Sequence, residues 1–474
     1  MKKGKTTTCG IAVVMLISLM VSCANLDNSS ALQGAPERGV ITDRNGIVLV
    51  SNDSVILSDS AGAIVARNYP HPTAAQLIGY VGKATEADVN NDDGYAVGDI
   101  IGKAGVEKFY DKILRVEEGR PGKNLKLTID YELQKLGEEL MEGKTGCVVA
   151  IEPSTGEVLC MVSSPSYNPQ LLSGNASDSV LQSLQQDSLK PLLNRCIMGQ
   201  YKPSDVFKAA RGLVLMSENI ISTQTRYPCE KGFEYRGLRI GCHDHSSPLT
   251  LAEALRTACS SYFYHGFLDM MNNPKYETVR DAYEKWYGHI ISLGFGSPLG
   301  IDLPGEKRGL IPNNQFYDTY FRGRWSAFTI LCNAVAQVTP LQLANLSAVI
   351  ANRGHYYIPH VVKEIQGEEI GSPYTTDRRT TISREAYDAI IDGMRLPVDC
   401  DTCSALAGQA IEARGLSGVA SSRVGNHPVF IGFAPVNNPK IAIAVYIEVY
   451  GKEKEEEGKY IGCHLMQQFI KGNH

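Results

Sequence analysis

The sequence predicts an α+β fold in which one antiparallel sheet is built from both ends of a domain and helices pack on it. Two hairpins predict the sheet, one in residues 146–169 with a turn at residues 154–156 and one in residues 429–449 with a turn at Asn437-Asn438. Between them, helical stretches dominate up to about Ala351. Because strands come early and late with helices between, we expect a single layered domain.

Two further segments carry their own turn or cap signals. In residues 38–52, Asn45-Gly46 tolerates the positive backbone angles of a tight turn, which predicts a hairpin. Residues 125–140 predict a strand followed by an amphipathic helix that is capped by Asp130. The charged run of residues 452–459 is expected to be a solvated loop.

Length and composition indicate an ordinary globular protein of two or three domains. The chain has 474 residues, of which 43% are hydrophobic and 20% charged, so disorder and fibrous repeats are not expected. The formal net charge of -5 is small for this length. Without a basic stripe, neither nucleic acid nor an anionic membrane surface is an expected electrostatic partner.

The first residues predict export and lipid anchoring. A lysine-rich start precedes an apolar run from Ile11 to Val21, which is shorter than the about 20 residues that span a bilayer. Ser22 and Cys23 follow, and a small residue before such a cysteine is typical of a lipoprotein signal. We expect Cys23 to carry lipid and the body to lie in the cell envelope on the periplasmic side. An uncleaved membrane anchor is the alternative.

Of the twelve cysteines, Cys9 would leave with the signal and Cys23 would carry lipid, so ten are expected in a compartment that permits disulfides. Cys229 and Cys242 bracket a short segment with glycines, which suits a disulfide across a hairpin or loop, and Cys400 and Cys403 form a lone C-x-x-C. A zinc site needs a second pair at metal-ligand spacing, which the nearby histidines supply only weakly. We therefore expect disulfides or free thiols at both places, and neither a metal nor a cofactor.

Several long segments resemble the class B penicillin-binding proteins, particularly the elongation-type penicillin-binding protein 2 group. In chain order they are RGVITDRNG from Arg38, LIGYVG from Leu77, GVEKFYD from Gly105, LTID from Leu127, VVAIEPSTGEVLCMVSSPSYNP from Val148, LGFGSPLGIDLPGE from Leu293, VTPLQLANLSAVIANRG from Val338 and FIGFAPVNNPKIAIAV from Phe430. The resemblance implies a transpeptidase domain of the serine β-lactamase-like fold, with helices on both faces of an antiparallel sheet. It implies a division into signal peptide 1–22, linker 23–37, shortened dimerisation-type pedestal 38–142 and transpeptidase-like domain 143–474.

In this family, the motifs S-x-x-K, S-x-N and K-T-G meet in one cleft. The serine attacks the carbonyl between two D-alanines of a peptidoglycan stem after the lysine accepts its proton. The resemblance places the first motif at YKPSDVFK, with Lys208 retained and Asp205 at the nucleophile position. We expect Asp205 to pair with Lys208 and to favour its charged form. Ser204 stands at a glycine position and is the rescue nucleophile, although it more naturally caps a helix.

The other two motifs are also degenerate. In the second, Ala258 replaces the serine and Ser260 the asparagine, and Cys259 between them is interpreted as a buried structural thiol. A leucine replaces the lysine of the third motif, and would place an apolar surface where the substrate carboxylate should dock. The four residues at the K-T-G-T positions are Leu416, Ser417, Gly418 and Val419. Arg414 or Arg423 is the candidate replacement for the missing charge.

Because no motif is intact, we expect a catalytically inactive, envelope-anchored binding or scaffold protein of peptidoglycan biogenesis. Its expected partners are the peptidoglycan stem peptide or cell-wall synthesis proteins, with membrane attachment through the lipid and no nucleic acid. The alternative is an active D,D-transpeptidase, carboxypeptidase or penicillin binder that uses Ser204 with Lys208.

Overall fold

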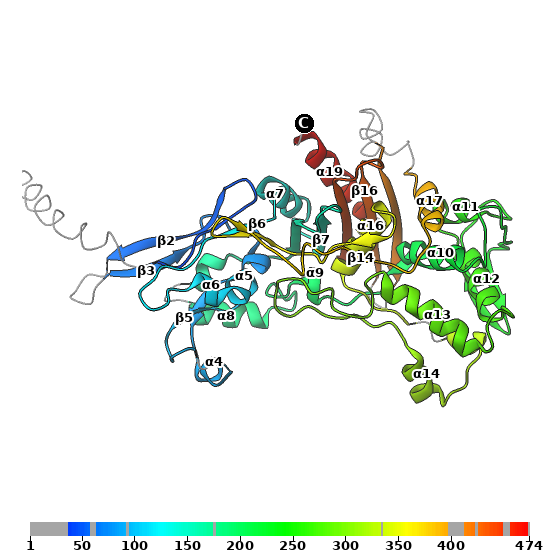
Figure 1. Cartoon of the computed structure of the whole chain (residues 1–474), viewed down its shortest axis with the longest axis horizontal. Coiled ribbons are helices and arrows are strands. Elements are labelled where there is room, and N and C mark those ends of the chain that lie inside the picture. Colours follow the sequence, from blue (N-terminus) through cyan, green and yellow to red (C-terminus); the bar gives the residue numbers. More distant parts are fainter. Residues whose placement is uncertain are drawn as a thin grey trace, which may run out of the picture.

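A computed structural model describes residues 37–56, 63–91, 94–173, 177–332, 335–396, 412–421, 425–448 and 456–472. The molecule is elongated, with the N-terminal strands at one end and helices α10 to α14 at the other (Figure 1). The predicted signal peptide, Cys23, Cys400, Cys403 and Arg423 lie outside the described residues. Among the helices that the structure describes, none has the length and apolarity required to cross a membrane.

The predicted antiparallel sheet has five strands in the order β15-β16-β17-β7-β8. These strands are β7 Thr145–Ile151, β8 Val158–Ser164, β15 Arg414–Ser421, β16 Asn426–Ala434 and β17 Ile441–Glu448. Strands β17 and β7 pair antiparallel, so the late hairpin is joined directly to the early one. The prediction of one sheet built from both ends of the domain is confirmed.

Both faces of this sheet are covered by helices. Along β7, the side chain of Val149 packs into one core with helix α16, Pro340–Ala351. The neighbouring Val148 packs into a second core with helices α7 and α19 on the opposite face, as expected from the alternation of side chains along a strand. Helix α7, Tyr131–Leu140, begins as predicted, because the Asp130 side chain accepts a hydrogen bond from the Leu133 amide.

Helix α19, Glu457–Gly472, begins within the segment that was expected to be a solvated loop through residue 459. Its buried residues Ile461, Leu465 and Phe469 recur every four positions and pack on the sheet. This spacing gives an apolar helix face, and the charged residues before it obscured where the helix begins.

The pedestal sheet has the order β13-β12-β6-β1-β2-β3. Its strands are β1 Ile41–Thr42, β2 Val48–Ile56, β3 Ala63–Asn68, β6 Leu125–Leu127, β12 Val362–Ile365 and β13 Glu368–Glu369. The hairpin predicted around Gly46 is confirmed by the pairing of β1 with β2 and by the φ of 91° at that glycine. Strands β12 and β13 follow α16 in sequence, so the chain crosses the predicted boundary at residues 142–143 to complete this sheet.

The remaining described elements connect the two sheets or extend beyond the main one. The helices are α3 Ala75–Ile78, α4 Glu86–Asn91, α5 Gly105–Phe109, α6 Asp111–Leu114, η1 Pro169–Leu172, α8 Ser177–Gln186, α9 Arg195–Met198, η2 Ser204–Phe207, α10 Lys208–Ser217, α11 Leu251–Arg256, α12 Ser260–Met271, α13 Val279–Ser292, α14 Asn314–Phe321, α15 Ala327–Cys332 and α17 Arg384–Gly393. The short strands are β4 Val81–Lys83, β5 Ile100–Gly102, β9 Gly232–Tyr235, β10 Leu238–Gly241, β11 His355–Tyr356 and β14 Arg378–Arg379.

A buried charge network holds the pedestal together. The Glu107 carboxylate lies 2.7 Å from Arg38 Nη2 and 2.7 Å from Arg67 Nε, and its side chain is fully buried. Asp111 lies 2.8 Å from the other terminal nitrogen of Arg38. Because the residues come from the linker end, β3 and the α5–α6 region, the network ties distant segments together.

We expect Glu107→Gln to destabilise the pedestal by about 3 to 5 kcal/mol, because it leaves two buried guanidinium groups facing a neutral side chain. The measurement is the free energy of unfolding in urea. The matched control is Glu118→Gln, which removes an exposed pair with Arg120 and should change stability by less than about 0.5 kcal/mol. Equal stability of the two variants would contradict this assignment.

Candidate active site and a neighbouring thiol cluster

The first motif begins in the short 3-10 helix η2, where Ser204 has a φ of 54°. This left-handed conformation costs a residue with a Cβ about 1 to 2 kcal/mol, whereas glycine adopts it readily. It accounts for the glycine that the family pattern carries at this position. The prediction that Ser204 is a helix cap is wrong, because an N-cap residue has an extended backbone.

Asp205 and Lys208 form the predicted ion pair, with 2.5 Å between Asp205 Oδ1 and Lys208 Nζ. Lys208 is only 5% exposed, and its ammonium also donates a hydrogen bond to the backbone carbonyl of Ala258. Asp205 is a third exposed. The lysine of the first motif is therefore bound by a carboxylate and a carbonyl where the family has a hydroxyl.

Two opposing effects act on the pKa of Lys208. Burial lowers the pKa of Lys208, and this effect outweighs the opposing attraction of Asp205. The predicted effect of Asp205, which favours the charged form of Lys208 and raises its pKa, is present but is smaller than the effect of burial. A lowered pKa is the direction that a general base requires, so the main departure from the family motif is Asp205 at the nucleophile position and not Lys208.

The second motif lies at the start of α12. Ala258 adopts a φ of 50°, so that its carbonyl meets Lys208, and its methyl group has no hydroxyl to relay a proton. Cys259 is the N-cap of α12 and is 1% exposed, and Ser260 is the first helical residue. The backbone of this motif thus retains a contact with the first motif, although the proton-relaying side chain is absent.

The third motif lies on β15, at the edge of the main sheet. Gly418 packs directly against η2, since a Cβ built on it would lie 2.6 Å from Asp205 Cβ. Leu416 is 7% exposed and belongs to the core, so the prediction that it forms an apolar docking surface is wrong. Ser417 and Val419 lie on the opposite face of the strand, where Ser417 is exposed.

Arg414 does not supply the missing charge of the third motif. It is 6% exposed, and its guanidinium donates hydrogen bonds to the carbonyls of Ile391 and Ala413 and to the Glu412 carboxylate. The proposal that this arginine replaces the lysine is therefore wrong. Arg414 lies at the start of β15, two residues before Leu416, and therefore precedes the motif.

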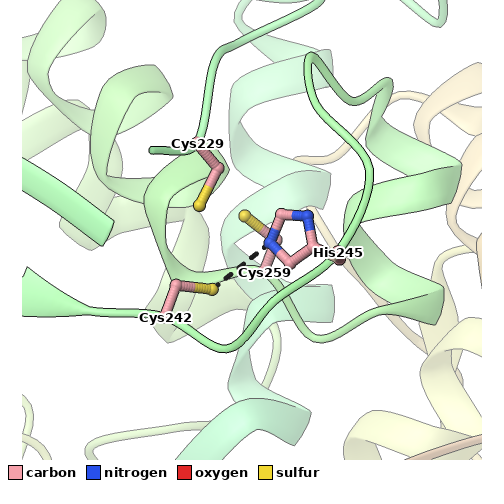
Figure 2. Close-up of side chains that lie close together, drawn as sticks. All are labelled: Cys229, Cys242, His245 and Cys259. Carbon is pink, nitrogen blue, oxygen red and sulfur yellow. Dashed lines mark hydrogen bonds between the residues drawn. The ribbon is translucent and has the colours of Figure 1, made fainter. Parts of the chain in front are cut away.

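A cluster of three cysteines and one histidine lies beside the second motif (Figure 2). The ligand atoms of Cys229, Cys242, His245 and Cys259, named here the thiol cluster, all lie within 4.8 Å of one another. Both Cys229 and Cys242 are free thiols in the structure, so the disulfide suggested by the sequence is not formed there. His245 Nε2 lies 3.4 Å from Cys242 Sγ.

The thiol cluster has the donor set of a structural zinc site, in which cysteine thiolates and a histidine nitrogen surround the ion. The sequence predicts no metal here, because a second pair of ligands at metal-ligand spacing is only weakly present and Cys259 is interpreted as a packing residue. The histidine signal was weighed as weak, yet the C-x-x-H spacing of Cys242 and His245 supplies two of the four possible ligands. The fourth ligand comes from another element, and only the fold brings it near.

We expect Asp205→Asn to destabilise the protein near neutral pH by about 1 to 3 kcal/mol, because the buried Lys208 ammonium loses its counter-charge. The folded-state pKa of Lys208 lies below its ordinary value of 10.5. Between these two pKa values the folded state binds fewer protons than the unfolded state, so stability rises with pH. In Asp205→Asn the folded-state pKa of Lys208 falls further, because the carboxylate that raises it is gone, so the pH range over which stability rises is wider. Its deficit against the wild type should therefore shrink as pH rises toward 10.5.

Urea unfolding at about pH 7 and about pH 10 measures this deficit. Asp392→Asn is the matched control, since Asp392 pairs with Arg395 at the same spacing on an exposed surface, and should cost less than about 0.5 kcal/mol at both pH values. A deficit for Asp205→Asn that does not change with pH would contradict the burial of a charged lysine.

Comparison with known proteins matches both parts of the chain. Residues 146–463 match the family model of the penicillin binding protein transpeptidase domain, and residues 60–145 match that of the penicillin-binding protein dimerisation domain. The peptidoglycan D,D-transpeptidase MrdA of Acinetobacter baumannii is 29% identical over 438 residues, which cover 81% of this chain and 63% of that protein. MrdA of Escherichia coli K12 is 25% identical over 463 residues, covering 85% of this chain and 70% of the relative.

Solved structures agree with these matches. Pseudomonas aeruginosa PBP2, solved with WCK 5153, has a TM-score of 0.79 and 29% identity, covering 92% of this chain and 96% of that one. Helicobacter pylori PBP2, solved in complex with MreC, has a TM-score of 0.75 and 23% identity, covering 92% and 98%, and shows the shared fold. The chain spans less than two thirds of the A. baumannii relative. It belongs to the penicillin-binding protein transpeptidase family, as a class B member similar to penicillin-binding protein 2.

Proposed function

We propose that this protein is a catalytically inactive class B penicillin-binding protein that acts in peptidoglycan biogenesis as an envelope-anchored binding or scaffold protein. The observation that carries the proposal is the ion pair of Asp205 and Lys208 at the place where the family has its serine and lysine. The relatives named above are peptidoglycan D,D-transpeptidases, which supports the cell wall as the setting.

The chemistry of acyl transfer explains why this pair is inert. A serine becomes a nucleophile when its hydroxyl proton passes to a base, whereas the Asp205 carboxylate has no proton to lose and is a feeble attacker of an amide. The Asp205 carboxylate is also engaged in an ion pair with Lys208. Loss of the nucleophile alone lowers turnover by about a million-fold in a serine acyl-transfer enzyme, and further losses in the same unit add little.

Binding does not require the nucleophile. Strand β15 remains at the edge of the main sheet, and Ser417 on it is exposed. The edge of a sheet can pair through its backbone with an extended peptide. We therefore propose that the ligand is a peptidoglycan stem peptide lying along β15, or a cell-wall synthesis protein, and that lipid on Cys23 holds the complex at the membrane.

Labelling with a fluorescent penicillin tests this function. We expect no covalent label on the purified protein, because formation of a penicilloyl ester needs an activated hydroxyl. An active class B transpeptidase, treated in parallel, provides the positive control. A label that appears on the wild type and disappears in Ser204→Ala would instead establish the enzymatic alternative, in which Ser204 acts with Lys208.

A further inference from the structure

A second group of hydrogen-bonded polar side chains lies at the end of α10 that is remote from the degenerate site. Helix α10 begins at Lys208 and ends at Ser217, and Glu218 follows it, so about 15 Å of helix separates Lys208 from Glu218. His289 lies near the end of α13, and Thr381 lies shortly before α17. These helices gather at the end of the molecule opposite the N-terminal strands (Figure 1). Thr381, His289 and Glu218 are named here the hydroxyl relay.

The imidazole of His289 joins the other two members of the hydroxyl relay. Its Nε2 lies 2.7 Å from Glu218 Oε1, and its Nδ1 lies 2.7 Å from Thr381 Oγ1. A carboxylate only accepts hydrogen bonds, so Nε2 carries a proton. In the neutral ring, Nδ1 then has a lone pair and accepts the hydrogen bond of the Thr381 hydroxyl. A hydroxyl that is bound by a base, which a third group orients in turn, is the arrangement that activates a nucleophile.

Glu218 is held in its charged form. Lys275 Nζ lies 2.8 Å and Tyr276 Oη 2.7 Å from its Oε2, and Lys285 Nζ lies 3.8 Å from its Oε1. Burial raises the pKa of Glu218, but the hydrogen bonds that the carboxylate accepts outweigh this effect and lower the pKa to about 2. At neutral pH the carboxylate is therefore an anion, which stabilises the imidazolium that forms when His289 takes up a proton.

Ser292 fixes the position of Thr381. The Ser292 hydroxyl donates a hydrogen bond to the His289 carbonyl, and its oxygen accepts one from the Thr381 amide at 3.2 Å. Because the Ser292 hydroxyl donates its only proton there, it offers Thr381 Oγ1 a lone pair alone, at 3.1 Å. Nδ1 of His289 is the nearer acceptor, so the proton of the Thr381 hydroxyl is directed to the imidazole.

The hydroxyl of the relay is accessible, whereas its base is shielded from water. Thr381 is exposed, and His289 is only 3% exposed. Both residues line a pocket of about 410 Å³, together with Asp281, Glu284 and Lys285. A substrate in this pocket would meet the Thr381 hydroxyl directly. Two carboxylates and one ammonium surround it, so the pocket disfavours an anionic acyl group.

We propose that the hydroxyl relay is a second acyl-transfer site, in which Thr381 is the nucleophile, His289 the general base and Glu218 the residue that orients this base. The substrate class is a small ester whose acyl group is neutral or cationic. The proposal goes beyond the proposed function and does not depend on it, because the relay uses no residue of the three family motifs.

The reaction is balanced as ester hydrolysis. Thr381 Oγ1 attacks the carbonyl carbon while its proton passes to His289 Nδ1. The Lys285 ammonium faces the oxyanion of the tetrahedral intermediate, which expels the alcohol, and the alcohol takes the proton from Nδ1. Water then attacks the acyl-threonine ester, gives a proton to Nδ1 and releases the carboxylic acid, while Thr381 regains its hydrogen. The net change is the addition of one water across the ester bond.

Labelling of the full-length protein with a fluorophosphonate tests the proposal. With this probe, Thr381 Oγ1 forms a bond to phosphorus, fluoride leaves and His289 takes the proton, so the reaction requires an activated hydroxyl. We expect a phosphonyl group on Thr381, located by peptide mapping. If Thr381 stays unlabelled under conditions that label a serine hydrolase treated in parallel, the proposal is overturned.

Three variants separate a nucleophile from a structural hydroxyl. Thr381→Val removes the hydroxyl at an exposed position and should abolish the label, whereas Thr381→Ser keeps a hydroxyl and should retain it. Thr223→Val is the matched control, because Thr223 is exposed in another pocket whose described lining contains no histidine, and should be labelled as the wild type is. A label that persists in Thr381→Val would contradict the assignment of the nucleophile.

Glu218→Gln tests the orienting residue. It should slow labelling of Thr381 by at least about 100-fold, because a neutral amide does not stabilise the imidazolium. Labelling is compared at a temperature where thermal unfolding shows both proteins to be folded. Labelling of this variant at the wild-type rate would show that Glu218 has a structural role only, and would contradict the relay.

Ester hydrolysis tests the substrate class. The neutral ester p-nitrophenyl acetate should be hydrolysed faster than the p-nitrophenyl half-ester of succinic acid, because the pocket carboxylates repel an anionic acyl group. Thr381→Val should lose this activity, and faster turnover of the half-ester would contradict the class. Peptide mapping assigns a phosphonyl group on Thr381 and a penicilloyl group near Lys208 to different peptides, so the failure of one proposal is distinguishable from the failure of the other.

Discussion

The ion pair between Asp205 and Lys208 is the interaction on which the functional account depends. In an active relative of this fold, the same two positions form a unit in which a base removes a proton from a hydroxyl. Here the corresponding side chain is the carboxylate of Asp205, which forms an ion pair with the buried Lys208. The pair satisfies the local electrostatics, because a buried lysine without a counter-charge is costly. The position thus keeps its local electrostatics satisfied although it offers no hydroxyl.

The surroundings of this pair bring the positions of the three family motifs together. The left-handed angles at Ser204 and Ala258 aim the two motifs at each other, and the absence of a side chain at Gly418 lets β15 approach Asp205. Such features depend on backbone shape and close approach, which substitutions of the reactive side chains leave intact.

Sequence patterns predicted the architecture better than the environment of individual residues. The turns at Gly46 and Asn438 and the cap at Asp130 are local signals, and each lies where it was expected. Whether Leu416 is buried and how burial shifts the pKa of Lys208 depend on the packing of segments far apart in the sequence. Helix α19 was missed because its apolar face follows a charged run.

The thiol cluster is the clearest example of a site that sequence patterns alone do not predict. Cys229 and Cys242 attracted attention as a pair, but the third cysteine belongs to a motif in which a cysteine is expected to pack in the core. Only the folded chain brings α12 against the hairpin of β9 and β10. Spacing along the sequence predicts local partners well, whereas a site assembled from three segments becomes visible only in three dimensions.

A crystal structure of the protein soaked with a penicillin tests the central claim most directly. The account predicts that the Asp205 carboxylate remains in contact with Lys208 and that no electron density joins the ligand to a side chain. Continuous density from the Ser204 hydroxyl to an opened β-lactam ring would contradict it.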